Sequence, residues 1–284
     1  MIYADDTQLI VSLKSSEREN VVGRLEICLQ ELRNWMVSNH LKLNDSKMEL
    51  LHVSSPFRRV QEALPLPLTS MIGQVLPSPS VCDLGVILDK NVNMRRHVNI
   101  VCRKASFALR RIGMIRSYLS KNVTEILIHA FDSSLLDNCN SLLYGTPDKD
   151  IAKLQRIQNS AARLVSRSKK HNHITPILKE LHWLPIKSRI RFKVLLITFN
   201  AVHGFAPQYI SELVSPYTPS RTLRSSTQLL IQVPRLRTKT HGERSFSYSA
   251  QTLWNSLPST LRSQNNPGLF KSQLKTFLFN EAFN

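Results

Sequence analysis

The first ninety residues alternate short apolar stretches with polar breaks, a pattern that predicts small strands, one helix and a long loop. Residues 1–13 place β-prone apolar residues on either side of Ala4-Asp5-Asp6-Thr7, which predicts a β-hairpin with both carboxylates at its turn. Residues 17–38 repeat apolar side chains at spacings of three and four, so we expect a helix there.

Between this helix and residue 90, short strands are expected on either side of a long loop. Residues 41–53 predict short strands around a turn at Asn44-Asp45-Ser46. Residues 54–80 contain five prolines and several serines, which predicts mostly loop. The apolar run 81–88, interrupted at Gly85, predicts one further strand.

The pattern changes near residue 91, where long helical repeats begin. From 94 to 119, apolar side chains recur in alternating steps of four and three, as in a packed helix. The same stretch holds seven cations and no acid, namely Arg95, Arg96, Arg103, Lys104, Arg110, Arg111 and Arg116. At 100° per residue, those opposite the apolar stripe are Arg96, Arg103, Lys104, Arg110 and Arg111. We expect a helix that packs with one side and presents a basic ridge on the other.

Further helices are predicted along the rest of the chain, at 122–137, 150–168, on both sides of Pro185 within 177–203, and at 207–217, 244–256 and 267–281. In the predicted helix 150–168, four cations lie away from the apolar stripe: Lys153, Arg156, Arg163 and Arg167. Residues 218–243 show no clear period and predict loop or short strands. The sequence contains no internal repeat.

The composition is that of a folded protein, since 42% of the 284 residues are hydrophobic. The longest apolar run, Val194-Leu195-Leu196-Ile197, is far shorter than the roughly 20 residues of a membrane span. The beginning of the chain has no secretory signal pattern. The four cysteines lie far apart without a CxxC pair, so we expect no disulfide framework and no zinc site. These features indicate an intracellular protein of the nucleus or cytoplasm.

Charge is distributed unevenly. The whole chain has a formal net charge of +18, yet residues 1–90 are slightly acidic and the excess of Lys and Arg lies entirely in residues 91–284. A positive excess confined to one region favours a polyanionic partner, most often nucleic acid. Two other interpretations stay open: a basic surface that only keeps the chain soluble, and a basic helix on a membrane surface.

Tyr3-Ala4-Asp5-Asp6 is the segment with the clearest chemistry. Nucleotide transfer by two metal ions needs carboxylates that hold two Mg²⁺ ions about 4 Å apart. A tight hairpin can present a carboxylate rigidly enough for this. An Asp-Asp pair is also common in ordinary turns, so the tetrapeptide alone does not decide the function.

Other segments follow this tetrapeptide in the order found in a known family. They are Thr7-Gln8-Leu9, Trp35-Met36, Asn39–Glu49, Leu84–Asp89, Ser133–Asn140, Ile157–Arg163, His173–Pro176, Leu181–Pro185, Thr218–Ser226, Leu253–Pro258 and Phe270–Lys275. The series resembles the reverse transcriptases of non-LTR (LINE-type) retrotransposons, close to the jockey and chicken-repeat groups. The resemblance covers essentially the whole chain.

The resemblance implies roles for residues of a polymerase palm. Asp5 matches the direct metal ligand and Asp6 the accessory one, for Mg²⁺ or Mn²⁺. Tyr3 would lie beside the primer end or the incoming nucleotide. Lys47 would donate a proton to pyrophosphate, and Leu84-Gly85-Val86 would form the primer grip.

The resemblance also implies the fold and the partners. We expect an α+β, predominantly helical chain with part of a polymerase palm at 1–91, a helical thumb at 92–170 and a basic helical extension at 171–284. The function would be RNA-directed DNA synthesis, with an RNA template and a DNA primer as partners. The basic ridge and the cations Lys153, Arg156 and Arg163 would face the template–primer backbone. Oligomeric state is left open.

The expected upstream parts of such an enzyme are missing from the 284 residues. Family members have fingers, a palm strand with another metal-binding aspartate and a glycine-containing motif of the nucleotide pocket before this point. The endonuclease of many such elements is also missing. Two alternatives therefore stay open: a non-catalytic nucleic-acid-binding module, and a decayed transposon fragment without function.

Smaller signals favour structural roles. His171, His173 and His182 have no cysteine or carboxylate at ligand spacing, so we interpret them as solvent or helix-boundary histidines. Trp35, Trp183 and Trp254 lie in apolar contexts and are expected to be core residues.

A polypeptide of these 284 residues is predicted not to extend a primer by itself. A single carboxylate cluster cannot hold two metals in the required geometry, and the nucleotide pocket needs the fingers. Primer extension with Mg²⁺ and an RNA template tests this prediction. Magnesium-dependent synthesis that disappears in Asp5→Asn would contradict it.

Overall fold

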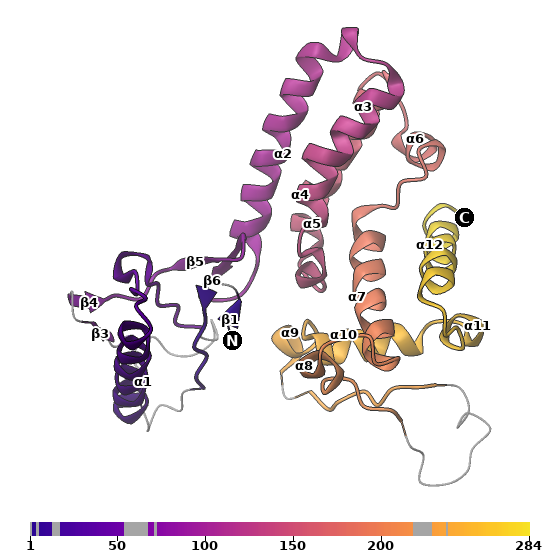
Figure 1. The fold of residues 1–284 in the computed structure, drawn as a ribbon. Helices are drawn as coiled ribbons and strands as arrows, with labels where there is room; N and C mark the ends of the chain where they lie inside the picture. Colours follow the sequence, from indigo (N-terminus) through magenta and orange to yellow (C-terminus); the bar gives the residue numbers. More distant parts are fainter. Residues whose placement is uncertain are drawn as a thin grey trace. The chain divides into compact units, whose positions relative to one another are not determined.

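The computed structural model describes residues 2–3, 6–12, 18–53, 68–70, 73–217, 229–236 and 238–284. The chain divides into two compact units, Met1–Arg96 and His97–Asn284. It is predominantly helical with small two-stranded sheets, so the α+β, mainly helical fold class is confirmed (Figure 1). The border predicted after residue 91 lies near the division between the units, and the border predicted after 170 falls inside the second unit.

In the first unit, the predicted N-terminal hairpin is present as two short antiparallel strands. Strand β1 (Ile2–Tyr3) pairs with β2 (Asp6–Thr7), with Tyr3 opposite Asp6. Asp6 therefore lies in a strand, and its prediction as a turn residue is wrong. Asp5 lies outside the described residues. The predicted helix 17–38 is confirmed as α1 (Arg18–Ser38).

The predictions between residues 41 and 89 need two corrections. Residues 41–53 hold a 3₁₀ turn, η2 (Asp45–Lys47), and a single bridge from Leu50 to Pro77 instead of short strands. The 54–80 segment contains strands where loop was predicted. These form the antiparallel pair β3 (Leu68–Ser70) and β4 (Gly73–Val75), and β5 begins at Ser80.

The apolar run 81–88 forms two strands instead of one. Strands β5 (Ser80–Asp83) and β6 (Val86–Asp89) pair antiparallel around the two-residue turn Leu84-Gly85. Both turn residues have positive φ, 45° at Leu84 and 83° at Gly85. Such a turn matches the twist of a hairpin, and glycine takes this conformation without a steric penalty. The glycine that was interpreted as a break in one strand is thus part of the reversal.

The second unit is a helical assembly in which all predicted long helices are confirmed within a few residues. Its first half contains α2 (Arg95–Ile115), η4 (Arg116–Tyr118), α3 (Lys121–Ile128), the π-helical turn η5 (His129–Ser133), α4 (Ser134–Asp137), η6 (Asn140–Leu143) and α5 (Asp148–Ser166). Its second half contains α6 (Ile174–Glu180), α7 (Ile186–Val202), α8 (Gln208–Ser211), α9 (Lys239–Gly242), α10 (Phe246–Asn255), α11 (Ser259–Arg262) and α12 (Pro267–Phe283).

Proline positions explain where several of these helices begin. Helices α5, α7, α8 and α11 each start directly after a proline, and α12 starts on Pro267. A proline has a fixed φ suited to the first turn, and its missing N–H costs no hydrogen bond there. Asn266 adds a cap to α12, since its side-chain oxygen accepts from the N–H groups of Gly268 and Leu269.

Two hydrophobic clusters hold the second unit together. One joins α2, α3, α5 and α6 through residues that include Leu109, Ile128, Val165 and Trp183. The other joins α7, α10 and α12. Gln158 of α5 is 1% exposed and donates from Nε2 to the Leu184 carbonyl 2.8 Å away, which connects the two groups of helices.

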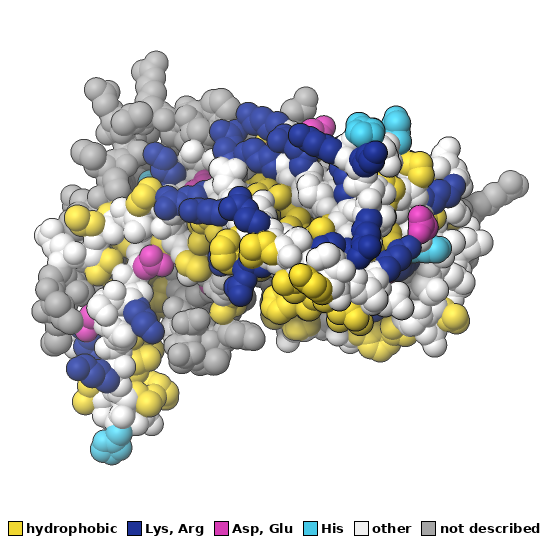
Figure 2. Space-filling view, turned by 90° about the horizontal axis from the view of Figure 1, so that it is seen from above, with side chains coloured by type: hydrophobic (Ala, Val, Ile, Leu, Met, Phe, Trp, Pro, Cys, Tyr) yellow, Lys and Arg dark blue, Asp and Glu magenta, His cyan; other side chains and the backbone are white. Residues whose placement is uncertain are grey.

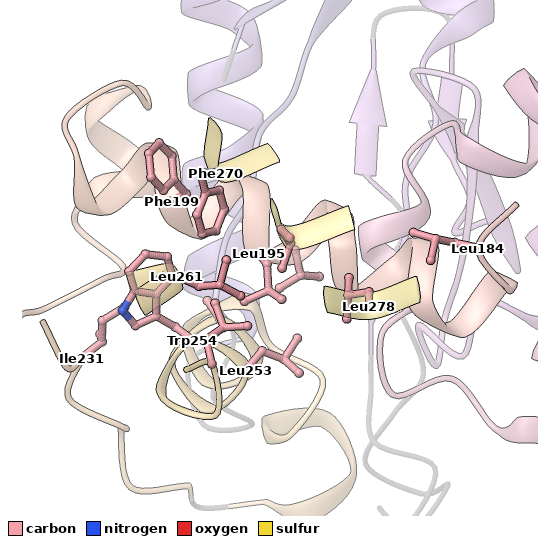
Figure 3. Packing of buried hydrophobic residues seen from close by; sticks show 13 residues of the cluster. Leu184, Leu195, Phe199, Ile231, Leu253, Trp254, Leu261, Phe270 and Leu278 are labelled. Atoms are coloured by element: carbon pink, nitrogen blue, oxygen red, sulfur yellow. The ribbon is translucent and has the colours of Figure 1, made fainter. Parts of the chain in front are cut away.

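Aromatic rings form the centre of the second cluster (Figure 3). Phe199 of α7 and Phe270 of α12 stack with ring centroids 4.2 Å apart. Trp254 of α10 is fully buried beside them, and its indole N–H donates to the Leu229 carbonyl at 2.8 Å. The expectation of core tryptophans is confirmed for Trp254 and for Trp183, which is 5% exposed, but is wrong for Trp35, which is 58% exposed.

Truncating Phe270 is predicted to lower the free energy of unfolding by about 3–5 kcal/mol, because the substitution Phe270→Ala leaves a cavity between α7, α10 and α12. The matched control Phe107→Ala removes the same atoms from a ring that is 61% exposed and should cost less than about 0.5 kcal/mol. Urea unfolding followed by circular dichroism measures both. Equal losses in the two variants would show that α12 does not pack as described.

Candidate nucleic-acid interface

Helix α2 separates its apolar and basic side chains as the sequence predicts. The buried face carries Val98, Val101, Ala105, Leu109 and Ile112. We define the basic ridge of the second unit as Arg103, Lys104, Arg110 and Arg111, all of which are exposed. Arg96 is also exposed and is the last residue of the first unit. In Figure 2, Lys and Arg side chains gather in patches with few acidic side chains among them.

The cations of the basic ridge have no acidic partners among the residues that the structure describes. Within the described part of the chain, Arg103, Lys104 and Arg110 make no hydrogen bond or ion pair. The Arg111 guanidinium lies over the Phe107 ring, 5.8 Å from its centroid, a cation–π contact that leaves its N–H groups at the surface. The ridge therefore presents positive charge that nothing in the described structure neutralises.

Three cations of helix α7, in contrast, pair with carboxylates. Lys187 pairs with Asp148 at 3.0 Å, and Arg191 pairs with Glu281 at 2.7 Å. Arg189 forms a bidentate pair with Asp137, in which the Nε–Oδ1 distance is 2.8 Å. These arginines and this lysine connect helices to one another, and their charge is locally balanced.

Arg116, one of the seven cations of the 94–119 segment but not of the predicted ridge, is buried, with 8% of its surface exposed. Its guanidinium donates to the carbonyls of Leu164, Leu119 and Val165 at 2.7, 2.7 and 2.9 Å. Arg116 follows Ile112 by four residues and Leu109 by seven, so it continues the buried stripe of α2. That spacing could have identified it as an interior residue.

The predicted contacts on α5 differ from one cation to the next. Arg156 is exposed. Lys153 pairs with Asp150 at 2.8 Å and donates to Asn99 at 2.9 Å. Arg163 is half-buried and donates to the Asn172 carbonyl at 3.2 Å. The interface is therefore based on α2 and Arg156.

Exposed apolar side chains lie among the cations of α2. Phe107, Met114 and Tyr118 are 61%, 70% and 87% exposed. On a helical projection, Phe107 lies about 40° from Arg103, and Met114 lies about 40° from Arg110. Bases can stack on such rings while cations contact the phosphates. The sequence analysis did not predict these exposed side chains, although Phe107 falls between Lys104 and Arg110 in the sequence.

The residues predicted to belong to a polymerase palm are described only in part. Tyr3 and Asp6 lie opposite each other in the first hairpin, and Asp5 lies outside the described residues. Lys47 is exposed at the end of η2. Leu84 and Gly85 form the exposed turn between β5 and β6.

Among the described residues, no group of three or more His, Cys, Asp or Glu side chains is arranged to hold a metal ion. Within the same residues, every helix is too short or too polar to cross a membrane. Comparisons with protein-family models, with the curated proteins and with the solved structures gave no match to this chain.

The π-helical turn η5 buries a carboxyl group without a partner. Asp132 is 1% exposed, and in the described part of the chain neither of its oxygens has a hydrogen-bond partner. Burial raises the pKa of Asp132 to about 7, although the charge of Arg189 acts in the opposite direction. Burial also raises the pKa of the Cys102 thiol, and the negative charge of Asp132 raises this pKa further.

Stability is predicted to fall as the pH rises from about 4 to about 7. The folded-state pKa of Asp132 lies above its ordinary value of 3.8, so over this interval the native state binds more protons than the unfolded state. Asp132→Asn should remove this dependence and raise the unfolding free energy at pH 8 by on the order of 3 kcal/mol.

Urea unfolding between pH 4 and pH 8 measures this effect. Asp148→Asn is the control, because that carboxylate is 84% exposed and its loss should change the profile little. An unchanged pH profile in Asp132→Asn would contradict the assignment.

Proposed function

We propose that this chain is the C-terminal part of a non-LTR retrotransposon reverse transcriptase, and that its second unit binds the template–primer duplex through phosphate contacts. One observation carries the proposal: the exposed cations of α2 lie on one side of a packed helix, without a carboxylate in that helix. The order of motifs along the sequence supports the family.

The dimensions of the ridge suit a phosphate backbone. From Arg103 to Arg111 the helix rises about 12 Å at 1.5 Å per residue. A duplex carries one negative charge per roughly 1.7 Å of its axis, so several phosphates fall within this length. Contacts of this kind position the duplex without selecting its sequence.

The distribution of acids supports a polyanionic partner over a surface that only keeps the chain soluble. A solvated charged face normally mixes both signs. Here carboxylates pair with the cations of α7, while the basic ridge has none. The exposed Phe107 and Tyr118 add surfaces on which bases can stack.

The polymerase roles in this proposal come from the family resemblance. Asp5 and Asp6 would hold Mg²⁺ or Mn²⁺ beside Tyr3. Lys47 is exposed and could reach a pyrophosphate. Leu84-Gly85 lies at a hairpin tip, where the backbone is open to a primer strand. The missing upstream parts would have to complete the active site.

Binding to an RNA–DNA primer–template is predicted to weaken steeply with salt. Six to ten phosphate contacts would reduce affinity by roughly 10³ to 10⁵ between about 50 and 200 mM salt. Arg103→Glu combined with Arg110→Glu should flatten the slope of log affinity against log salt by at least about 2. Fluorescence anisotropy of a labelled primer–template measures the slope.

The control is Lys193→Glu combined with Lys275→Glu. It makes the same change in net charge at exposed positions of α7 and α12. This control should change the slope much less. Weak binding with a flat slope in the wild-type chain would contradict the proposal and favour a fragment without function. Equal effects of the two double variants would show that binding depends on net charge and not on α2.

A further inference from the structure

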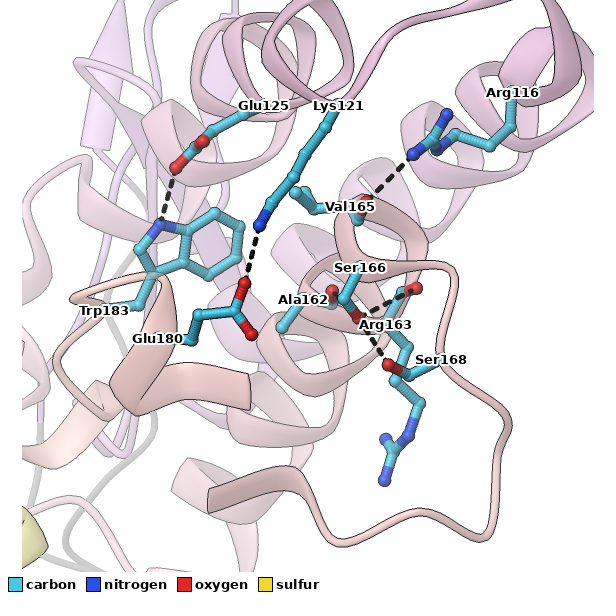
Figure 4. Close-up of polar contacts among 10 residues, drawn as sticks. All are labelled: Arg116, Lys121, Glu125, Ala162, Arg163, Val165, Ser166, Ser168, Glu180 and Trp183. Atoms are coloured by element: carbon cyan, nitrogen blue, oxygen red, sulfur yellow. Dashed lines mark hydrogen bonds and ion pairs between the residues drawn. The ribbon is translucent and has the colours of Figure 1, made fainter. Parts of the chain in front are cut away.

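A cavity of about 360 Å³ lies where the end of α2, the beginning of α3 and the end of α5 meet (Figure 4). It is lined by Arg116, Leu119, Ser120, Lys121, Val165, Ser166 and Arg167. All of these residues belong to the second unit. The lining thus combines three cations and two hydroxyl groups with a small apolar floor, and contains no carboxylate.

The two arginines place like charges close together. Arg167 is exposed and donates from Nη2 to the backbone carbonyl of Arg116 at 3.3 Å. Burial and the neighbouring charge of Arg167 both lower the pKa of Arg116. Arg116 uses three of its five N–H groups on carbonyl oxygens, which fixes it in place. An anion in the cavity would relieve this repulsion.

Lys121 is the movable cation of the cavity. Its ammonium pairs with Glu180 of α6 at 2.7 Å, and both side chains are about half exposed or more, at 49% and 62%. Exposed pairs of this kind contribute little to stability, so Lys121 can exchange Glu180 for a stronger anion at small cost. Figure 4 shows the Lys121 ammonium directed to Glu180 and the Arg116 guanidinium directed to Val165.

The start of α3 adds to the positive potential. Ser120 caps the helix by accepting from the Val123 N–H at 3.2 Å. The N–H groups of Lys121 and Asn122 precede this bond and have no acceptor inside the helix. The helix dipole is positive at this end. The cavity therefore combines the fixed guanidinium of Arg116, the exposed guanidinium of Arg167, one movable ammonium and a helix N-terminus.

We propose that this cavity binds a phosphate monoester at the end of a nucleic-acid strand. A terminal phosphate carries up to two negative charges, whereas a phosphodiester carries one, and three surrounding cations favour the more highly charged group. The cavity follows the basic ridge on the same helix, since Arg116 lies five residues after Arg111. A strand held by the ridge could place its end here. Inorganic phosphate shares the same chemistry.

The test compares short DNA oligonucleotides of one sequence with a phosphate at the 5′ end, at the 3′ end or at neither end. Binding is measured by anisotropy at about 200 mM salt, where contacts to phosphodiesters are weakened. We expect one of the two terminal phosphates to raise affinity about tenfold or more over the unphosphorylated strand. Lys121→Gln combined with Arg167→Gln should abolish this preference. The control, Lys193→Gln combined with Lys275→Gln, should keep it.

The strand-end site is inferred from residues of the second unit and does not require that the chain belongs to a polymerase. The inference and the proposed function can therefore fail separately. Arg103→Glu combined with Arg110→Glu should weaken all three oligonucleotides and leave the preference unchanged. Equal binding of the three oligonucleotides to the wild-type chain would overturn a strand-end site. Inorganic phosphate is the second probe. If it raised the melting temperature of the wild type but not of Lys121→Gln/Arg167→Gln, without any strand-end preference, the ligand would be free phosphate instead.

Discussion

The hydrogen bonds of the buried Arg116 guanidinium join the helices of the first half of the second unit. Burying a cation is costly unless its N–H groups are satisfied. Arg116 meets this condition by donating to carbonyls in the last turn of α5 and at the end of η4. The C-terminal end of α5 carries a partial negative charge, which favours a cation there. One side chain thus joins α5 to the end of α2, and two members of this junction, Arg116 and Val165, line the cavity.

Several of the few acidic residues of the second unit pair with cations that connect helices. Asp137, Asp148 and Glu281 each pair with a cation of α7. Within the described residues, Arg103, Lys104 and Arg110 of α2 have no such partner, so their charge remains available to an external polyanion. The same residue types therefore act in two ways, and the position of the carboxylates decides which. The proposal of nucleic-acid binding is based on this arrangement more than on the net charge alone.

Periodicity predicted the long helices and the buried face of α2, because a packed helix must repeat its apolar residues every three or four positions. It missed features that depend on single contacts. Arg116 was not assigned to the basic ridge, but its burial was not predicted either, since two of its carbonyl partners come from a distant helix. The β5–β6 hairpin was predicted as one strand, because the reversal needs only Leu84 and Gly85. Lys47 follows Asn44-Asp45-Ser46, whose turn closes as 3₁₀ instead of joining strands.

The π-helical turn η5 lies within an otherwise uninterrupted helical stretch, Lys121–Asp137. A π turn accommodates about one residue more than an α-helical turn, and each residue of an α-helix advances by about 100°. Residues after the turn therefore face directions that a regular helix would not give them. Asp137 is among them, and its carboxylate holds Arg189 of α7. A chain shortened by one residue between His129 and Ser133 could keep its helix yet turn Asp137 away from α7. The extra residue of the π turn thus determines which residues of α4 face α7. The number of residues between His129 and Asp137 is therefore constrained, whatever their side chains are.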